Sequence, residues 1–145
     1  MPKIELDEKH AVLFGIYAEY QKALPDMASL SFTTLDMDQR VFNVALVKLQ
    51  NEGLIDGLVT FPPGTRMEPK AVALDSVMPT RCGLEYVERR LDIAAMGTGK
   101  EKLERLAEKF GKLGWAVLQE LATDILKGLV EGHDMRGGYR DERDE

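Results

Sequence analysis

The clearest hydrophobic periodicity lies within residues 36–57, which predict a helix followed by the start of a strand. Apolar residues recur there at intervals of three and four and so share one helical face: Phe42, Ala45, Leu46 and Leu49. Asp36, with Gln39 three residues on, is typical of a capping box at the start of a helix. Gly53 followed by Leu54 is typical of a helix that ends in a left-handed residue. We expect this helix to belong to a small three-helix core.

A second helical pattern precedes it, over residues 7–24. Asp7 is placed to cap this helix, and Pro25 disfavours helical geometry in the residue before it. Its apolar stripe consists of Leu13, Ile16, Tyr17, Tyr20 and Leu24. Between the two helices, residues 27–30 predict one short helical turn, and the β-forming residues 32–34 predict a short extended segment.

Two short β-forming runs follow, at residues 58–61 and 71–74. A Pro-Pro-Gly turn stands between them, so the two runs predict a hairpin whose irregular tip spans residues 62–70. Thr80 is then placed to cap a helix over residues 81–91.

A Gly-Thr-Gly break precedes the last helical region. Residues 100–130 predict a long amphipathic helix or a broken pair of helices, with a bend at Gly111 and Gly114. The apolar positions have the spacing of a helical seam and are Leu103, Leu106, Phe110, Leu113, Val117, Leu121, Ile125 and Leu129. From Gly132 onward the chain is rich in glycine and charge, which predicts a disordered tail.

The order of these elements predicts the fold. Helix, short turn, helix, strand, loop, strand and helix is the plan of a winged-helix domain. We therefore predict an α+β, mostly helical chain: a winged helix-turn-helix domain with a β-hairpin wing at residues 1–96, a long C-terminal helical extension at 97–131, and a tail at 132–145.

Three segments also carry a family resemblance: DQRVFNVALVKLQNEGLIDG, MPTRCGLEYVERRLDI and TGKEKLERLAEKFGKLGWAVLQELATDIL. The first has an EGLI helix end, the second a Thr-x-x-Gly helix start at Thr80, and the third a helix that passes through Trp115. In this order the chain resembles the YjcQ-like winged-helix proteins, small proteins of bacterial phages and prophages. The resemblance covers most of residues 8–130. It implies a DNA-binding fold and implies no reaction or ligand.

The polar side of the helix in residues 36–57 suits base recognition. Gln39, Arg40 and Asn43 are residue types that make bidentate contacts with base edges. They lie in the N-terminal half of the helix, where a recognition helix contacts bases. The candidate phosphate contacts are Lys48 on this helix and Arg66 and Lys70 on the wing. The sequence thus predicts a winged-helix DNA-binding protein, a transcriptional regulator of a phage or prophage that acts as a homodimer on double-stranded DNA.

The charge of the chain leaves a second hypothesis open. The net charge is −6, whereas domains that hold nucleic acid through its phosphates are usually basic. Asp36 and Asp38 would repel phosphates at the start of the helix. The alternative is a protein–protein interaction module on a winged-helix scaffold that does not bind DNA, since a fold alone does not determine function.

The C-terminal extension carries apolar residues on more than one side, which predicts that it packs both on its own domain and against a second copy. The predicted dimerisation residues are Leu103, Leu106, Phe110, Leu113, Trp115, Val117, Leu121 and Ile125.

Other chemistry is not legible in the sequence. The single cysteine, Cys82, cannot form an intramolecular disulfide or a cysteine-based zinc site, and the two histidines lack the spacing of metal ligands. The run that ends at Lys100 does not fit a phosphate-binding loop, because Glu101 follows it. We expect no enzyme activity, cofactor, metal or small-molecule ligand. The first residues lack the apolar run of a signal peptide and no stretch is apolar enough to span a bilayer, so we expect a cytoplasmic protein.

Overall fold

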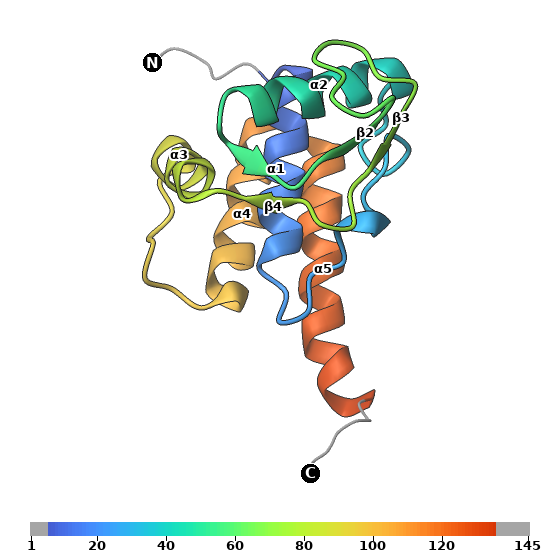
Figure 1. The fold of residues 1–145 in the computed structure, drawn as a ribbon. Coiled ribbons are helices and arrows are strands. Elements are labelled where there is room, and N and C mark those ends of the chain that lie inside the picture. The colour runs from blue at the N-terminus through green and yellow to red at the C-terminus, as the bar shows by residue number, and fades with distance from the viewer. Residues whose placement is uncertain (1–5, 136–145) are drawn as a thin grey trace.

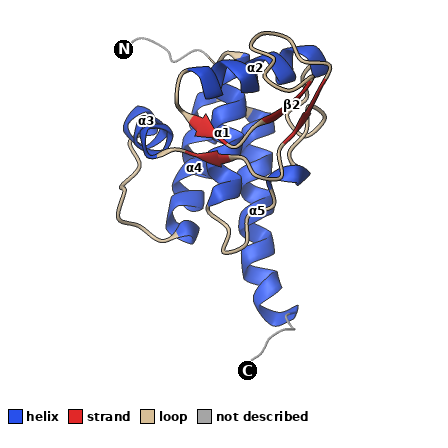
Figure 2. Ribbon diagram, in the orientation of Figure 1, coloured by secondary structure: helices blue, strands red, loops and turns tan. Residues whose placement is uncertain are grey.

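The computed structural model describes residues 6–135 as an α+β chain that is mostly helical (Figures 1 and 2). The helices are α1 Glu8–Tyr20, the single 3₁₀ turn η1 Met27–Ser29, α2 Gln39–Asn51, α3 Arg81–Leu91, α4 Gly99–Leu113 and α5 Ala116–Met135. The strands are β1 Ile55–Asp56, β2 Val59–Phe61, β3 Ala71–Ala73 and β4 Met78–Pro79. Helix α2 crosses α1 near the start of α1, and α5 runs beside both α1 and α4 (Figure 1).

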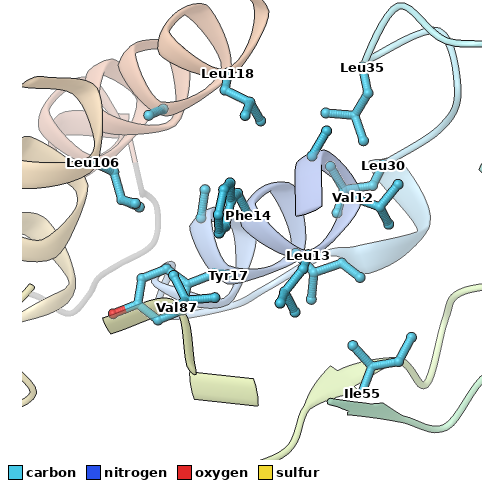
Figure 3. Packing of buried hydrophobic residues seen from close by; sticks show 14 of the residues in the cluster. Val12, Leu13, Phe14, Tyr17, Leu30, Leu35, Ile55, Val87, Leu106 and Leu118 are labelled. Carbon is cyan, nitrogen blue, oxygen red and sulfur yellow. The ribbon is translucent and has the colours of Figure 1, made fainter. Parts of the chain in front are cut away.

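The first helix, α1, is the centre of the molecule, because every residue from Ala11 to Glu19 is buried. A helix that is apolar all round is expected to be enclosed by the rest of the fold. Figure 3 shows how its side chains reach different neighbours: Phe14 points toward Leu106 and Leu118, and Tyr17 lies beside Val87. The predicted core residues of α2 are also buried, namely Phe42, Leu46 and Leu49.

Both ends of α1 have an identifiable cause. The helix begins as predicted, because the Asp7 side chain accepts a hydrogen bond from the amide of His10. It ends at Tyr20, and the prediction that it continues to Leu24 is wrong: Leu24 is 81% exposed. The buried Glu19 carboxylate accepts from the amide of Asp26 and pairs with Lys22, which fastens the turn that follows the helix.

The segment between α1 and α2 forms turns. The predicted helical turn at residues 27–30 is confirmed as η1. The predicted extended segment at 32–34 is wrong, because these residues lie in hydrogen-bonded turns. The hydroxyls of Ser31, Thr33 and Thr34 bond to one another and to nearby backbone, a local alternative to a strand.

Helix α2 starts two residues later than its capping prediction. Asp38 is the cap, and its side chain accepts from the amides of Arg40 and Val41. Asp36 lies in a left-handed turn with φ 54°, so it does not cap the helix. The end is as predicted: Gly53 has φ 77°, and the amide of Leu54 bonds the carbonyl of Leu49.

Two small antiparallel sheets follow. The predicted hairpin is confirmed as β2 and β3, with Val59 opposite Ala73 and Phe61 opposite Ala71. The second sheet pairs β1 with β4, and its two-residue strands are too short for a sequence pattern to reveal. Thr80 caps α3 as predicted, through a bond from the amide of Gly83.

The C-terminal region is a helical hairpin. Residues 100–130 form the broken pair of helices, because α4 ends at Leu113 and its C-cap Gly114 has a left-handed φ of 77°. Thr98 and Glu101 make a capping box at the start of α4 that the sequence reading did not identify. Helix α5 continues to Met135, three residues beyond the predicted start of the tail at Gly132, and residues 136–145 lie outside the described part of the chain.

One hydrophobic core joins the two predicted segments, residues 1–96 and 97–131. The ring of Phe14 stacks on that of Trp115, with centroids 5.7 Å apart, and also contacts Phe110. A polar link lies at the edge of this core. The hydroxyl of Tyr17 donates to Glu88 at 2.9 Å, and Lys102 donates to the same carboxylate oxygen at 3.1 Å, which connects α1, α3 and α4.

Candidate nucleic-acid interface

The structure places the predicted DNA-binding residues on two elements. Gln39, Arg40 and Lys48 are exposed on α2, and Arg66 and Lys70 are exposed on the loop between β2 and β3, residues 62–70. The exception is the sixth residue. Asn43 was predicted to face outward but is only 4% exposed, so that prediction is wrong.

The hairpin lies against α2, on which Asn43 is buried. Three contacts hold the hairpin there. Leu58 donates its amide to the side chain of Gln50 at 2.8 Å. Asn51 donates from its side chain to the carbonyl of Arg66 at 3.4 Å, and Arg40 pairs with Glu68. Asn43 lies on the α2 stripe between these anchors. The chain from β2 to β3 arches over α2 in Figure 1.

The pairing of Arg40 with Glu68 occupies the guanidinium predicted to read bases. The Nε atom donates to one carboxylate oxygen at 2.5 Å and Nη2 donates to the other at 3.1 Å. The hydrogen bond and charge of Glu68 raise the pKa of Arg40, and the same bond lowers the pKa of Glu68. Arg40 therefore has a partner within its own chain, in a pair that lies at the surface with the Arg40 side chain 78% exposed.

The open side of α2 borders a groove instead. We call it the α1–α2 groove: a hollow of about 550 Å³ lined by Asp7, Glu8, Lys9, Asp38, Arg40, Val41, Val44, Ala45, Lys48 and Glu68. Its floor is apolar, formed by Val41, Val44 and the small side chain of Ala45. Charged residues from α1, α2 and the β2–β3 loop form its rim. The apolar periodicity of α2 does not reveal this groove, because Val41 and Val44 lie outside the stripe formed by Phe42, Ala45, Leu46 and Leu49.

Most of the cations on this rim are already paired. Lys9 donates to both carboxylate oxygens of Glu52, at 2.8 and 2.9 Å, and Arg40 is held by Glu68. Within residues 6–129, Lys48 is the one groove cation that forms no salt bridge, whereas Glu8 and Asp38 are carboxylates that form none. The rim is therefore acidic in character.

Asp7 lies on the same rim and is held by His10. Its carboxylate lies 2.7 Å from Nδ1 of His10, whose other ring nitrogen lies 2.5 Å from the hydroxyl of Tyr86. Partial burial acts to raise the pKa of Asp7, but the hydrogen bonds from the His10 amide and ring lower it overall. The Asp7–His10–Tyr86 chain fastens the start of α1 to α3. The spacing of Asp7 and His10 within one helical turn was a local signal for its first link.

The predicted dimerisation residues are mostly committed to the core of their own chain. Five of the eight are buried there: Leu103, Leu106, Phe110, Trp115 and Ile125. The remaining three, Leu113, Val117 and Leu121, are half-buried. The seam that these positions form therefore packs α4 and α5 together and onto α1, and homodimerisation itself stays a prediction.

The remaining candidate chemistry is sparse in the described part of the chain. Cys82 is exposed on the first turn of α3. Among residues 6–135 there is no group of three or more metal-ligating side chains. Within the same residues, no helix has the length and hydrophobicity needed to cross a bilayer. Comparison of the chain with protein-family models, with curated proteins and with solved structures finds no match.

Proposed function

We propose that this chain is a protein-interaction module on a winged-helix scaffold, and that its binding site is the α1–α2 groove. One observation carries the proposal: among the α2 residues predicted to read bases, Asn43 is buried and Arg40 pairs with Glu68, while the side of α2 next to α1 is an apolar hollow with an acidic rim. Apolar side chains at the centre of a patch and polar ones around it are typical of protein interfaces.

The order of elements supports the winged-helix part of the proposal. A helix, a short 3₁₀ turn, a second helix and a β-hairpin follow one another as that plan requires. Two departures matter for function. The middle helix of the plan is reduced to η1, and the hairpin loop bends back to α2 through Glu68. Both departures favour a scaffold for protein contacts over a reader of the major groove.

Electrostatics point the same way. A duplex laid against the open side of α2 would bring its phosphates close to Glu8 and Asp38, which form no salt bridges among the described residues. Counterion release cannot compensate for this, because the one groove cation without a salt bridge there is Lys48. The net charge of −6 adds a long-range repulsion.

The DNA-binding homodimer remains a second candidate. It is favoured by the exposure of Lys48, Arg66 and Lys70, none of which forms a salt bridge within the described residues. In that case the chain would be the phage or prophage transcriptional regulator that the sequence analysis predicts. Asn43 would have to become exposed before it could reach a base.

Titration of a fluorescein-labelled 20-base-pair duplex at 50 mM salt separates the two candidates. Even non-specific DNA-binding proteins have Kd values of about 10⁻⁴ to 10⁻⁶ M at physiological salt. We expect the anisotropy of the duplex not to change up to about 10⁻⁴ M protein. Micromolar binding that weakens in Arg66→Ala and Lys70→Ala, with the salt slope reduced by about one for each, would establish the DNA-binding candidate.

A further inference from the structure

We infer that the α1–α2 groove binds a basic amphipathic segment of a partner protein, one that carries lysine or arginine beside two apolar side chains. This inference rests on the function proposed above and specifies the chemistry of the partner. The groove is lined by residues from the start of α1 and from α2, Lys48 among them. These two helices pack against each other near the N-terminal end of α1 (Figure 1).

The floor of the groove sets the apolar part of the partner. Val41 and Val44 are three residues apart, so their side chains are neighbours on the surface of α2. Val41 is 39% exposed although it is a large apolar residue in the middle of a charged surface. Ala45 has only a methyl group, and its small size leaves the hollow between the rim residues. A partner that inserts a leucine-sized side chain above Ala45 and lays a second one on Val41 would cover this floor.

The rim sets the charge of the partner. Glu8 on α1 and Asp38 at the N-cap of α2 form no salt bridge among the described residues. Lys9 and Arg40, which could neutralise them, are engaged by Glu52 and Glu68. A cation on the partner would therefore meet carboxylates on both walls, and a single carboxylate could pair with Lys48.

The same charges disfavour the other occupants. A nucleic acid would bring phosphates to Glu8 and Asp38. A second copy docked groove to groove about a two-fold axis would face the same acidic rim with its own. Complementary charge mainly selects the partner and speeds its encounter, while the apolar contact supplies affinity.

Selection on the complete chain with a displayed library of random 16-residue peptides tests the inference. We expect the selected peptides to contain more lysine and arginine than aspartate and glutamate, with two apolar residues three or four positions apart. One such peptide, labelled with fluorescein, is then titrated against the wild-type chain and four variants.

The four variants form two matched pairs. Val41→Gln removes the exposed apolar side chain of the floor, and Leu24→Gln does the same at a site that is not part of the groove. Glu8→Gln removes a rim charge, and Glu104→Gln removes one from the exposed side of α4. We expect a roughly 5- to 30-fold higher Kd for Val41→Gln. We expect a roughly 2- to 5-fold higher Kd for Glu8→Gln at low salt only, and no change in either control.

The outcomes separate this inference from the function on which it rests. Selected peptides that are acidic, or that bind Val41→Gln as tightly as wild type, overturn the groove inference and leave the interaction function standing. Failure to select any peptide counts against the interaction function and removes the inference with it. A dimer in sedimentation equilibrium that Val41→Gln dissociates would show that a second copy occupies the groove, which also overturns the inference.

Discussion

Tyr17 shows most directly how one residue joins three helices. It is fully buried on α1, and its hydroxyl donates to the carboxylate of Glu88 on α3, which also accepts from Lys102 on α4. Removing the hydroxyl with Tyr17→Phe takes a hydrogen bond from a charged acceptor. We therefore expect the free energy of unfolding to fall by about 1.5–3 kcal/mol in urea titrations.

The control for this substitution is Tyr20→Phe, because the Tyr20 hydroxyl makes no hydrogen bond within the described residues. Its unfolding free energy should change by less than about 0.5 kcal/mol. Equal losses in the two variants would mean that the bond to Glu88 contributes nothing.

Alkaline pH gives an independent readout of the same bond. Burial first, and then the hydrogen bond and charge of Glu88, raise the pKa of Tyr17 above its ordinary value of 10.0. The folded chain thus favours the protonated phenol, so this stabilisation is complete below pH 10 and is lost as the pH rises above it. The difference in the free energy of unfolding between wild type and Tyr17→Phe should therefore decrease by about 1 kcal/mol between pH 8 and pH 11. A constant difference would contradict a raised pKa.

At the scale of the elements, the start of α3 is held unusually close to the end of α2. A Cβ added at Gly83 would lie 2.0 Å from the carbonyl oxygen of Leu54, and this oxygen also accepts the amide of Thr80. This carbonyl belongs to the backbone, which cannot move aside to relieve the clash as the end of a flexible side chain could. We expect Gly83→Ala to lower the free energy of unfolding by about 1–3 kcal/mol.

Gly128→Ala is the matched control, since Gly128 lies within α5 and a Cβ there would meet nothing within 4 Å. Alanine is a better helix former than glycine, so the free energy of unfolding of this variant should rise by up to about 1 kcal/mol. Thermal unfolding followed by circular dichroism measures both. A Gly83→Ala chain as stable as wild type would mean that α3 can shift away from Leu54.

The elements also show what sequence patterns can and cannot predict here. Helix ends set by local chemistry, such as the Asp7 and Thr80 caps and the left-handed Gly53, were predictable. The end of α1 was not, because the turn that follows it is held by a bond from the Asp26 amide to the buried Glu19 side chain, which periodicity does not reveal. Asn43 was misplaced for the same kind of reason: its burial depends on tertiary packing, which the periodicity of α2 does not contain. Periodicity predicted which side of α2 is apolar. It could not predict which polar residues of α2 are exposed and which are buried by other parts of the chain.

At the scale of the whole molecule, the extension at residues 97–131 completes the core around α1. Leu103, Leu106, Phe110 and Trp115 pack against the cluster that contains Phe14 and Tyr17. A chain that stops at residue 96 would leave that side of α1 in water. We expect this fragment to show no cooperative thermal transition, whereas the complete chain unfolds in one transition in which Trp115 fluorescence and circular dichroism coincide. A cooperative transition in the fragment would show that residues 1–96 fold alone.

The enclosure of α1 has a consequence for the making of the protein. Ribosomes add residues at about 5–20 per second, so roughly 5–20 s pass between the completion of α1 and the arrival of Ile125 on α5. During that interval the most hydrophobic helix of the nascent chain lacks its final cover. Binding by a chaperone, or slow translation before residue 116, would therefore affect the yield of native molecules more than their final stability.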